Sequence, residues 1–402
     1  MKIGVYGGTF NPPHLGHLAA ARAAMDALGL DKLLLMPAAT PPHKELPPGS
    51  PPAADRLAMA EKLVDALLMP KTVQVSTLEM DRPGPSYTAD TVEQLHEREP
   101  ESELWLLVGS DMFLSLHTWR EPERIMKYAS VCAFHRTQAD EAVRFAAQKE
   151  RLERDYGARV QLIPVPGLVE ISSTRLRELL SQGEGREYLH PSVYGYILLH
   201  GLYGTHADLK HLELPELRAC SYAMMKEKRV AHVQGVEEEA ARLARRWGGD
   251  EGLARRAGVL HDCTKYLELP EQLALCQQYG VELDQLEHSA VKLLHSKTGA
   301  CIARAVFGEP DEVYWAIFWH TTAKADMTTL EKILYVADYM EPNRDFEGVE
   351  RLRALAYEDL DQALLLGVET TIQEMIDRRL PIHSNTLAAR DWLTAHGVSV
   401  TL

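Results

Sequence analysis

The chain is 402 residues long, 46% hydrophobic and 25% charged, which is typical of a soluble globular protein with room for two domains. Its net charge of -15 divides into -5 for residues 1–205 and -10 for residues 206–402, so neither half has the basic excess of a nucleic-acid binder. No apolar run approaches the roughly 20 residues of a membrane span, no signal-peptide pattern opens the chain, and five scattered cysteines fit a reducing cytoplasm.

The first unit of the chain is a short strand (2–6), a turn reading GGTFNPPHLGH (7–17) and an alanine-rich helix. Glycines in such a turn let the backbone approach a ligand closely, and a helix N-terminus directs unpaired N–H groups at the same point. His14 and His17 are three residues apart, so they share a face of the first helical turn and can donate to one phosphate. The pattern predicts a phosphate site.

Further strands are predicted at 32–37, 73–76, 104–108, 131–134 and 161–165, with helices between them. A proline-rich loop carrying Lys44 follows the second strand, and Ser86 to Asp90 read as a helix cap. Gly109-Ser110-Asp111 follow the 104–108 strand directly, where ligands of parallel sheets bind. The string ISSTRLRELL from Ile171 opens a helix with capping hydroxyls and two arginines, which is a second anion site by geometry. The alternation predicts an α/β doubly wound parallel sheet.

Both anion motifs resemble signatures of the nucleotidyltransferase superfamily, namely H-x-G-H and I-S-S-T-x-[IL]-R, and the longer first string is similar to nicotinate-mononucleotide adenylyltransferases. The resemblance implies a Rossmann-like fold and transfer of AMP from ATP to nicotinate mononucleotide, with Mg²⁺ on the leaving pyrophosphate. It implies His14, His17 and Arg175 as catalytic residues. The implied ATP-binding residues are Gly8, Thr9, Phe10, His17, Ile171, Ser172, Ser173, Thr174 and Arg175. The implied mononucleotide-binding residues are Lys44, Ser86, Tyr87, Thr88, Asp111, Trp119 and Arg136.

Several readings stay open for this half. Ser86 and Thr88 can be explained by helix capping, and Lys44 by solvation of a loop. Another transferase specificity, for nicotinamide mononucleotide or pantetheine phosphate, shares both anion motifs, although SYTADT and Trp119 favour a pyridine nucleotide. Residues 1–204 are expected to form this domain and residues 205–212 a linker.

From residue 213 to 402 the strand patterns vanish, and amphipathic helices predict an all-α domain. The expected helices are 215–233, 236–247, 253–260, 270–279, 289–307, 311–320, 329–340, 352–379 and 386–396. Histidines and aspartates occur near the helix ends in the order His232, His261-Asp262, His295, His320 and Asp338. Imidazole and carboxylate without thiolate suit iron, manganese, zinc or magnesium.

The order H…HD…D resembles the HD metal-dependent phosphohydrolase superfamily, and with LEKILYVADYMEP it is similar to symmetrical diadenosine tetraphosphate hydrolases. The resemblance implies that the six residues named above bind one or two ions of iron or another divalent transition metal. It also implies that Arg229 and Lys265 contact polyphosphate. It implies that metal-activated hydroxide splits diadenosine tetraphosphate into two ADP. Another nucleotide phosphohydrolase, or a nucleotide sensor without turnover, remains the alternative. A homo-oligomer is compatible with the sequence.

Overall fold

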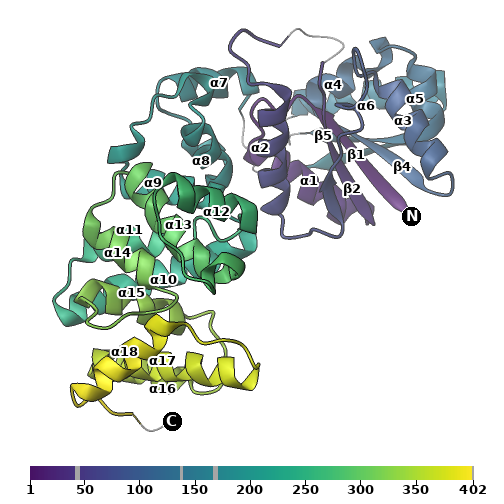
Figure 1. Ribbon diagram of the computed structural model, residues 1–402. Helices are drawn as coiled ribbons and strands as arrows, with labels where there is room; N and C mark the ends of the chain where they lie inside the picture. The colour runs from purple at the N-terminus through teal and green to yellow at the C-terminus, as the bar shows by residue number, and fades with distance from the viewer. Residues whose placement is uncertain (41–45, 136–138, 166–170, 401–402) are drawn as a thin grey trace. The chain divides into compact units, whose positions relative to one another are not determined.

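The computed structural model describes residues 1–40, 46–135, 139–165 and 171–400. They divide into two compact units, Met1–His206 and Ala207–Leu402 (Figure 1). Two residues expected to bind mononucleotide, Lys44 and Arg136, lie outside the described residues.

The N-terminal unit is organised around a six-stranded parallel sheet with strand order β3-β2-β1-β4-β5-β6. The strands are β1 (Lys2–Gly8), β2 (Lys32–Pro37), β3 (Val73–Val75), β4 (Glu103–Val108), β5 (Ala129–His135) and β6 (Val160–Pro164). The chain adds strands on one side of β1 up to β3 and then on its other side from β4 to β6, so the strand order reverses between β1 and β4. Ligands of such sheets bind at the carboxyl ends of the strands beside that reversal. The predicted doubly wound α/β fold is confirmed.

Side chains of the central strands alternate between two hydrophobic cores, one on each face of the sheet. Leu33 and Leu35 of β2 enter one core, whereas Leu34 and Met36 enter the other. Strand side chains point to opposite faces at every second residue, so a strand buried on both faces reads as a continuous apolar run. This is why the run in β2 is apolar at almost every position.

Helices pack on both faces of the sheet (Figure 1). They are α1 (Leu15–Leu28), α2 (Ala53–Asp65), α3 (Thr88–Arg98), α4 (Ser110–Ser115), α5 (Pro122–Tyr128), α6 (Ala139–Tyr156), α7 (Ser173–Ser181) and α8 (Pro191–Leu199). Ala24 of α1 and Leu63 of α2 belong to one core, and Val92 of α3 and Leu152 of α6 to the other. The parallel strands are thereby covered on both sides, as their apolar sequences require.

The described part of the C-terminal unit is helical and forms no strands, as predicted. Its α-helices are α9 (Leu214–Ala223), α10 (Glu227–Trp247), α11 (Glu251–Leu260), α12 (Leu269–Gln278), α13 (Val291–Ala305), α14 (Asp311–Trp319), α15 (Thr329–Met340), α16 (Val349–Glu358), α17 (Leu360–Asp377) and α18 (Ser384–Ala395). Gly258 of α11 lets α10 approach closely, because a Cβ there would lie 2.7 Å from the Cα of Glu237. A search of the described helices for a segment long and apolar enough to cross a bilayer finds none.

Three predicted helix boundaries in this unit are wrong. The expected break between helices 215–233 and 236–247 is absent, because α10 runs unbroken from Glu227 to Trp247. The expected helix 215–233 is broken, because α9 ends at Ala223 and Lys226 takes an extended conformation before α10. The expected helix 352–379 is divided at Asp359, whose side chain accepts hydrogen bonds from the backbone N–H groups of Asp361 and Gln362 and so caps α17. An aspartate inside an apolar periodic pattern therefore marks a new helix start here.

Candidate functional site

A cavity of about 400 Å³ lies at the carboxyl ends of β1 and β4 in the N-terminal unit. Seven of the residues expected to bind substrates line it: Gly8, Thr9, Phe10, His17, Ser86, Thr88 and Trp119. The described residues that line this cavity do not include His14, Tyr87, Asp111 or residues 171–175. The turn after β1 and the segment after β4 thus converge on one hollow at the reversal of the sheet.

The two histidines of the first motif are held in register at the start of α1. Their ring centroids are 3.8 Å apart, and the backbone N–H of His14 donates to Nδ1 of His17 at 3.1 Å. Because a backbone N–H can only donate, Nδ1 of His17 carries no proton and Nε2 carries the ring proton. Burial lowers the pKa of His14 to about 4, and burial together with His14 lowers the pKa of His17 well below 6.5. Both rings are therefore neutral near pH 7.

Two polar atoms of this turn have no hydrogen-bond partner in the described part of the chain. Among the described residues, Nδ1 of His14 and Oδ1 of Asn11 are buried without a hydrogen-bond partner. A buried polar group that stays unpaired costs about 1–3 kcal/mol. Neither Asn11 nor His14 lines the cavity, so this cost belongs to the fold of the turn itself.

Two arginines from different helices hold this turn by hydrogen bonds to its backbone. Arg56 of α2 is fully buried, and its guanidinium donates to the carbonyl oxygens of Thr9, Ala38 and Ala39 at 2.9, 2.7 and 3.0 Å. Arg177 of α7 donates to the carbonyl oxygen of Asn11 at 2.8 Å. The second bond ties the ISSTRLR segment to the histidine turn, although the two are far apart in sequence.

The start of α7 is capped as predicted, since the side chain of Ser172 accepts a hydrogen bond from the backbone N–H of Arg175. Ser173 and Thr174 lie in the first turn, and Ile171 packs against the core. The guanidinium of Arg175 is exposed and pairs with Glu178 at 3.1 Å, whereas Arg177 contacts both Thr174 and the histidine turn. Sequence reasoning placed both arginines at this end but singled out only Arg175.

The segment at the start of α3 differs from the expected cap. Tyr87 occupies the N-cap position without a side-chain capping bond, and the hydroxyl of Ser86 donates to the carbonyl of Glu79 instead. The capping interpretation of Ser86 and Thr88 is therefore wrong. The Tyr87 ring is covered by the guanidinium of Arg120 at 4.3 Å, and Asp111 is exposed in the first turn of α4.

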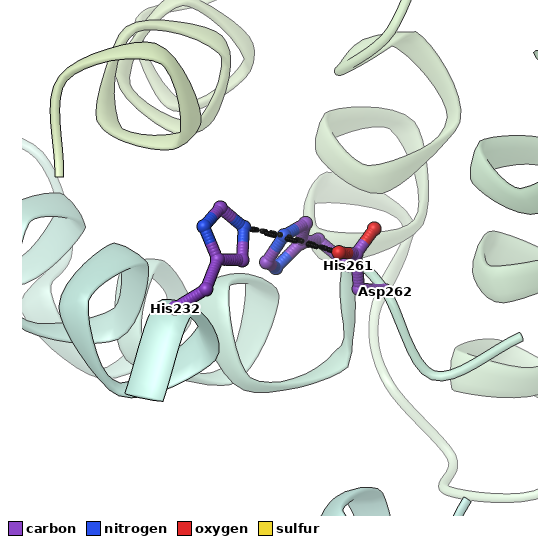
Figure 2. A group of neighbouring side chains, drawn as sticks. All are labelled: His232, His261 and Asp262. Atoms are coloured by element: carbon purple, nitrogen blue, oxygen red, sulfur yellow. Dashed lines mark hydrogen bonds and ion pairs between the residues drawn. The ribbon is translucent and has the colours of Figure 1, made fainter. Parts of the chain in front are cut away.

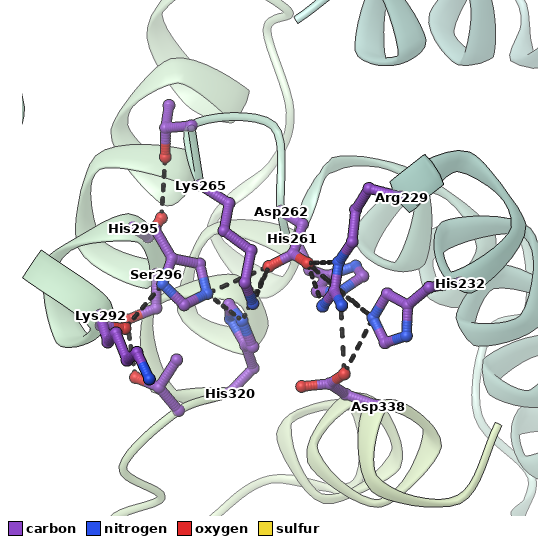
Figure 3. Close-up of polar contacts among 12 residues, drawn as sticks. Arg229, His232, His261, Asp262, Lys265, Lys292, His295, Ser296, His320 and Asp338 are labelled. Atoms are coloured by element: carbon purple, nitrogen blue, oxygen red, sulfur yellow. Dashed lines mark hydrogen bonds and ion pairs between the residues drawn. The ribbon is translucent and has the colours of Figure 1, made fainter. Parts of the chain in front are cut away.

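The six residues expected to bind metal in the C-terminal unit come together from five helices or helix ends. Figure 2 shows His232, His261 and Asp262 pointing toward one another, and Figure 3 adds His295, His320 and Asp338. They form three overlapping groups whose ligand atoms lie within 4.8 Å of one another: His232, His261 and Asp262; His261, His320 and Asp338; and Asp262, His295 and His320.

The imidazoles of this cluster have their lone pairs directed inward. Nδ1 of His261, His295 and His320 each lies 2.7 Å from a backbone carbonyl, so each must donate its proton there. In the neutral rings Nε2 then carries a lone pair, yet the Nε2 atoms of His295 and His320 face each other at 3.2 Å, as do those of His232 and His261. Facing lone pairs repel unless a cation lies between them, so the donor set fits a metal.

The charges in the cluster are also those that metal ligands need. Burial would raise the pKa of Asp262, but His261 and His295 lower it well below its usual range. Burial and the neighbouring His295 keep the pKa of His320 well below 6.5. Burial likewise lowers the pKa of His295. Burial acts in the same direction on His232, but Asp338 and Glu341 raise the pKa of that ring, so it is the exception and must lose its proton when it binds a metal.

Three cations surround the cluster. Arg229 donates to Oδ2 of Asp262 at 2.5 Å, and Lys265 lies 3.1 Å from Oδ1 of the same carboxylate (Figure 3). Sequence reasoning missed the third, Arg344, which donates to Oδ1 of Asp338 at 2.6 Å. It also missed Glu341, whose carboxylate accepts a hydrogen bond from Nδ1 of His232 at 3.0 Å and orients that ring. The spacing of Glu341, three residues after Asp338, was the signal available for it.

The comparisons with known proteins divide the chain in the same way. The family model for cytidylyltransferase-like proteins matches residues 5–179, and the model for the HD domain matches residues 229–343. A Thermus thermophilus protein named probable nicotinate-nucleotide adenylyltransferase is 38% identical over 208 residues, which are 50% of this chain and 100% of that protein. The chain belongs to the nicotinate-nucleotide adenylyltransferase family. This adenylyltransferase family member carries an HD domain as its second half.

Two relatives match that second half. The symmetrical bis(5'-nucleosyl)-tetraphosphatase of Bacillus subtilis is 35% identical over 181 residues, which are 45% of this chain and 97% of that protein. A solved structure from Clostridium acetobutylicum, described as a predicted HD superfamily hydrolase involved in NAD metabolism, is 38% identical. It covers 46% of this chain and 98% of its own, with a TM-score of 0.45.

Proposed function

We propose that the N-terminal unit transfers the adenylyl group of ATP to nicotinate mononucleotide, giving deamido-NAD and pyrophosphate. The observation that carries this proposal is the cavity at the reversal of the sheet, which brings His17, Thr88 and Trp119 together at the N-terminus of α1. Family membership supports the same assignment. Aromatic Trp119 offers a face for a pyridine ring, and the helix start favours an anion.

The chemistry follows from the protonation states. The mononucleotide phosphate is already an anion, so it needs no general base to attack the α-phosphorus of ATP; the new P–O bond forms as the bond to pyrophosphate breaks. Neutral His17 donates its Nε2 proton as a hydrogen bond to a phosphate oxygen, and Arg177 lies at the junction of the two anion motifs. Magnesium, bound to the leaving pyrophosphate, would neutralise its charge; Glu79 is the one carboxylate among the described residues that line the cavity.

Steady-state kinetics test this assignment. We expect His17→Ala to lower kcat about 100-fold or more while KM changes little, because hydrogen bonds to the developing charge are worth about that much. His117→Ala, which alters a histidine on the short 3-10 turn Leu116–Thr118 outside the set of cavity-lining residues, is the matched control. Near-normal turnover of His17→Ala, or a kcat/KM that favours nicotinamide mononucleotide or pantetheine phosphate, would reject the assignment.

We propose that the C-terminal unit is a metal-dependent hydrolase that splits diadenosine tetraphosphate symmetrically into two ADP. The converging lone pairs of its imidazoles carry the metal part of this proposal, and the Bacillus relative supports the substrate. His232, His261, Asp262, His295, His320 and Asp338 would hold one or two divalent ions. Such an ion activates water and neutralises charge on the phosphate that is attacked.

The chain's own residues then position the polyphosphate. Lys265, with 34% of its side chain exposed, and Arg229, with 18%, both reach the cluster from its rim. Their charges can pair with phosphate oxygens that flank the attacked phosphorus. The backbone carbonyls of Gly258, Lys292 and Ile317, together with the Glu341 carboxylate, orient the ligand rings by accepting hydrogen bonds from their Nδ1 atoms.

Incubation of the full chain with iron, manganese, cobalt or zinc and a panel of dinucleoside polyphosphates tests this proposal. ADP as the one product from diadenosine tetraphosphate supports it, and AMP plus ATP would show asymmetric cleavage and contradict it. Asp262→Asn should remove the activity, whereas Asp284→Asn, on a separate and partly exposed carboxylate, should not. Binding of nucleotide without turnover under every metal would instead support a sensor.

A further inference from the structure

A second cavity, of about 830 Å³, lies in the C-terminal unit beside the metal-ligand cluster. Its wall is formed by the end of α15, the segment after it and the last turns of α17. Tyr339, Arg344, Phe346 and Thr370 are among the residues that line it. Small-molecule sites typically enclose about 300–1,000 Å³, so the hollow has room for a nucleoside.

Arg344 links this cavity to the cluster. Its Nε donates to the backbone carbonyl of Asp338 at 2.8 Å, and its Nη2 donates to the Asp338 carboxylate at 2.6 Å. Tyr339 directly follows Asp338 on α15, so one turn of helix presents a ligand on one side and the cavity wall on the other. A molecule with phosphates at the cluster would therefore extend past Arg344 into this hollow.

The aromatic part of the wall offers an apolar face. Tyr339 and Phe346 are half-buried and meet edge to face, with ring centroids 6.0 Å apart. Tyr339 is fixed by a stacked contact with Tyr335 at 5.6 Å and by a 2.5 Å hydrogen bond between its hydroxyl and Thr371. Rigid, partly exposed rings at the mouth of a cavity are the partners that nucleic-acid bases stack on.

Three carboxylates also line this cavity. Glu347, Glu374 and Asp377 line it, whereas the cations Arg229, Lys265 and Arg344 gather at Asp262 and Asp338. Carboxylates repel phosphates but accept hydrogen bonds from ribose hydroxyls and exocyclic amino groups. The charges thus separate into a phosphate region at the cluster and a region for an uncharged, hydroxyl-rich group in the cavity.

We propose that this cavity binds one nucleoside of the polyphosphate substrate, with the base against Phe346 and Tyr339 and the phosphates directed past Arg344 to the cluster. The proposal rests on the hydrolase function proposed above and adds the residues that recognise the nucleoside. It also predicts that a polyphosphate without a nucleoside binds more weakly.

Steady-state hydrolysis by the full-length, metal-loaded protein provides the first test. Phe346→Ala should raise KM for diadenosine tetraphosphate and the inhibition constant of ADP about tenfold each, which corresponds to about 1.4 kcal/mol, with kcat within twofold. The inhibition constant of inorganic tripolyphosphate should stay unchanged, and Phe346→Trp should restore both raised constants. Trp315→Ala removes an aromatic side chain that is 42% exposed on α14 and is the matched control, with no expected change.

Photolabelling with 8-azido-ADP, mapped by peptide mass spectrometry, tests the cavity without requiring turnover. Label should appear in peptides that contain residues 339–347 or 370–377 and should fall about tenfold in Phe346→Ala. Absence of label there, or an equal loss of ADP and tripolyphosphate binding in Phe346→Ala, would overturn the nucleoside site. Label that appears there in a protein without hydrolysis would support the nucleoside site while rejecting the proposed function.

Discussion

Replacing the buried Arg56 with methionine is the sharpest test of how the first turn is held. Methionine fills most of the space of the side chain but cannot donate, so the carbonyl oxygens of Thr9, Ala38 and Ala39 lose their partner. Each unpaired buried carbonyl costs about 1–3 kcal/mol. Methionine also removes the cost of burying the guanidinium, whose pKa is lowered by burial, and this offsets part of that loss. We expect a net loss of about 3 kcal/mol in the free energy of unfolding.

Hydrogen exchange at increasing denaturant, followed in peptides from β1 and β2, measures that free energy for the N-terminal unit within the full chain. The matched control is Arg154→Met, since Arg154 is exposed on α6 and forms a surface ion pair with Asp155, and we expect it to cost less than about 1 kcal/mol. Thr9 and Ala38 line the cavity, so Arg56→Met should also raise KM for the substrates of adenylyl transfer. A loss below 1 kcal/mol would mean that water satisfies these carbonyls, and the reasoning would fail.

Three further predictions concern protonation and metal binding. The pKa of His14 is about 4 in the folded unit and about 6.5 in the unfolded chain, so the unfolded state binds more protons between these two pH values. The free energy of unfolding is therefore highest above pH 6.5 and should fall by about 2–3 kcal/mol toward pH 4. A His14→Gln variant whose stability shows the same dependence on pH would refute this prediction. Asp262→Asn should lower bound transition metal, measured by mass spectrometry of the purified protein, and leave adenylyl transfer unchanged; full metal content would contradict the ligand assignment. Gly235→Ala should weaken metal binding about 10–100-fold, because the new Cβ would lie 2.4 Å from Oε2 of Glu341, the residue that orients His232. An unchanged dissociation constant for the metal would argue against that role of Glu341.

The strands of the sheet were predictable because each one has a recognisable sequence pattern of its own. Strands buried on both faces must be apolar at every position, and the turns between them must carry glycine, proline or capping hydroxyls. The order of the ligands in the second half was visible because it is a feature of the sequence itself, although His232 lies inside α10 and not at the helix end expected for it. The break at Asp359 was missed because the apolar period continues on both sides of it, and only the hydrogen bonds of the cap reveal the new start.

The supporting residues could not be predicted, because nothing local distinguishes them. Arg56 lies on an amphipathic helix where an arginine normally faces water, and its three carbonyl partners come from two other loops. Arg344 follows a turn rich in polar residues, and its role depends on folding back onto Asp338 six residues earlier. Glu79 is buried, which raises its pKa, and it lines the first cavity, although its sequence surroundings read as an exposed loop. Such roles depend on tertiary contacts that a pattern does not contain.

The two units use the same side chain in opposite tautomers, and the backbone decides which. In the first unit a backbone N–H donates to Nδ1 of His17, so the ring proton must lie on Nε2 and the imidazole acts as a donor to phosphate. In the second unit backbone carbonyls accept from Nδ1 of His261, His295 and His320, so Nε2 keeps its lone pair and the rings act as ligands. A histidine motif alone therefore cannot tell a phosphate donor from a metal ligand. The partner of Nδ1 can, because it fixes which nitrogen carries the proton before any substrate or ion arrives.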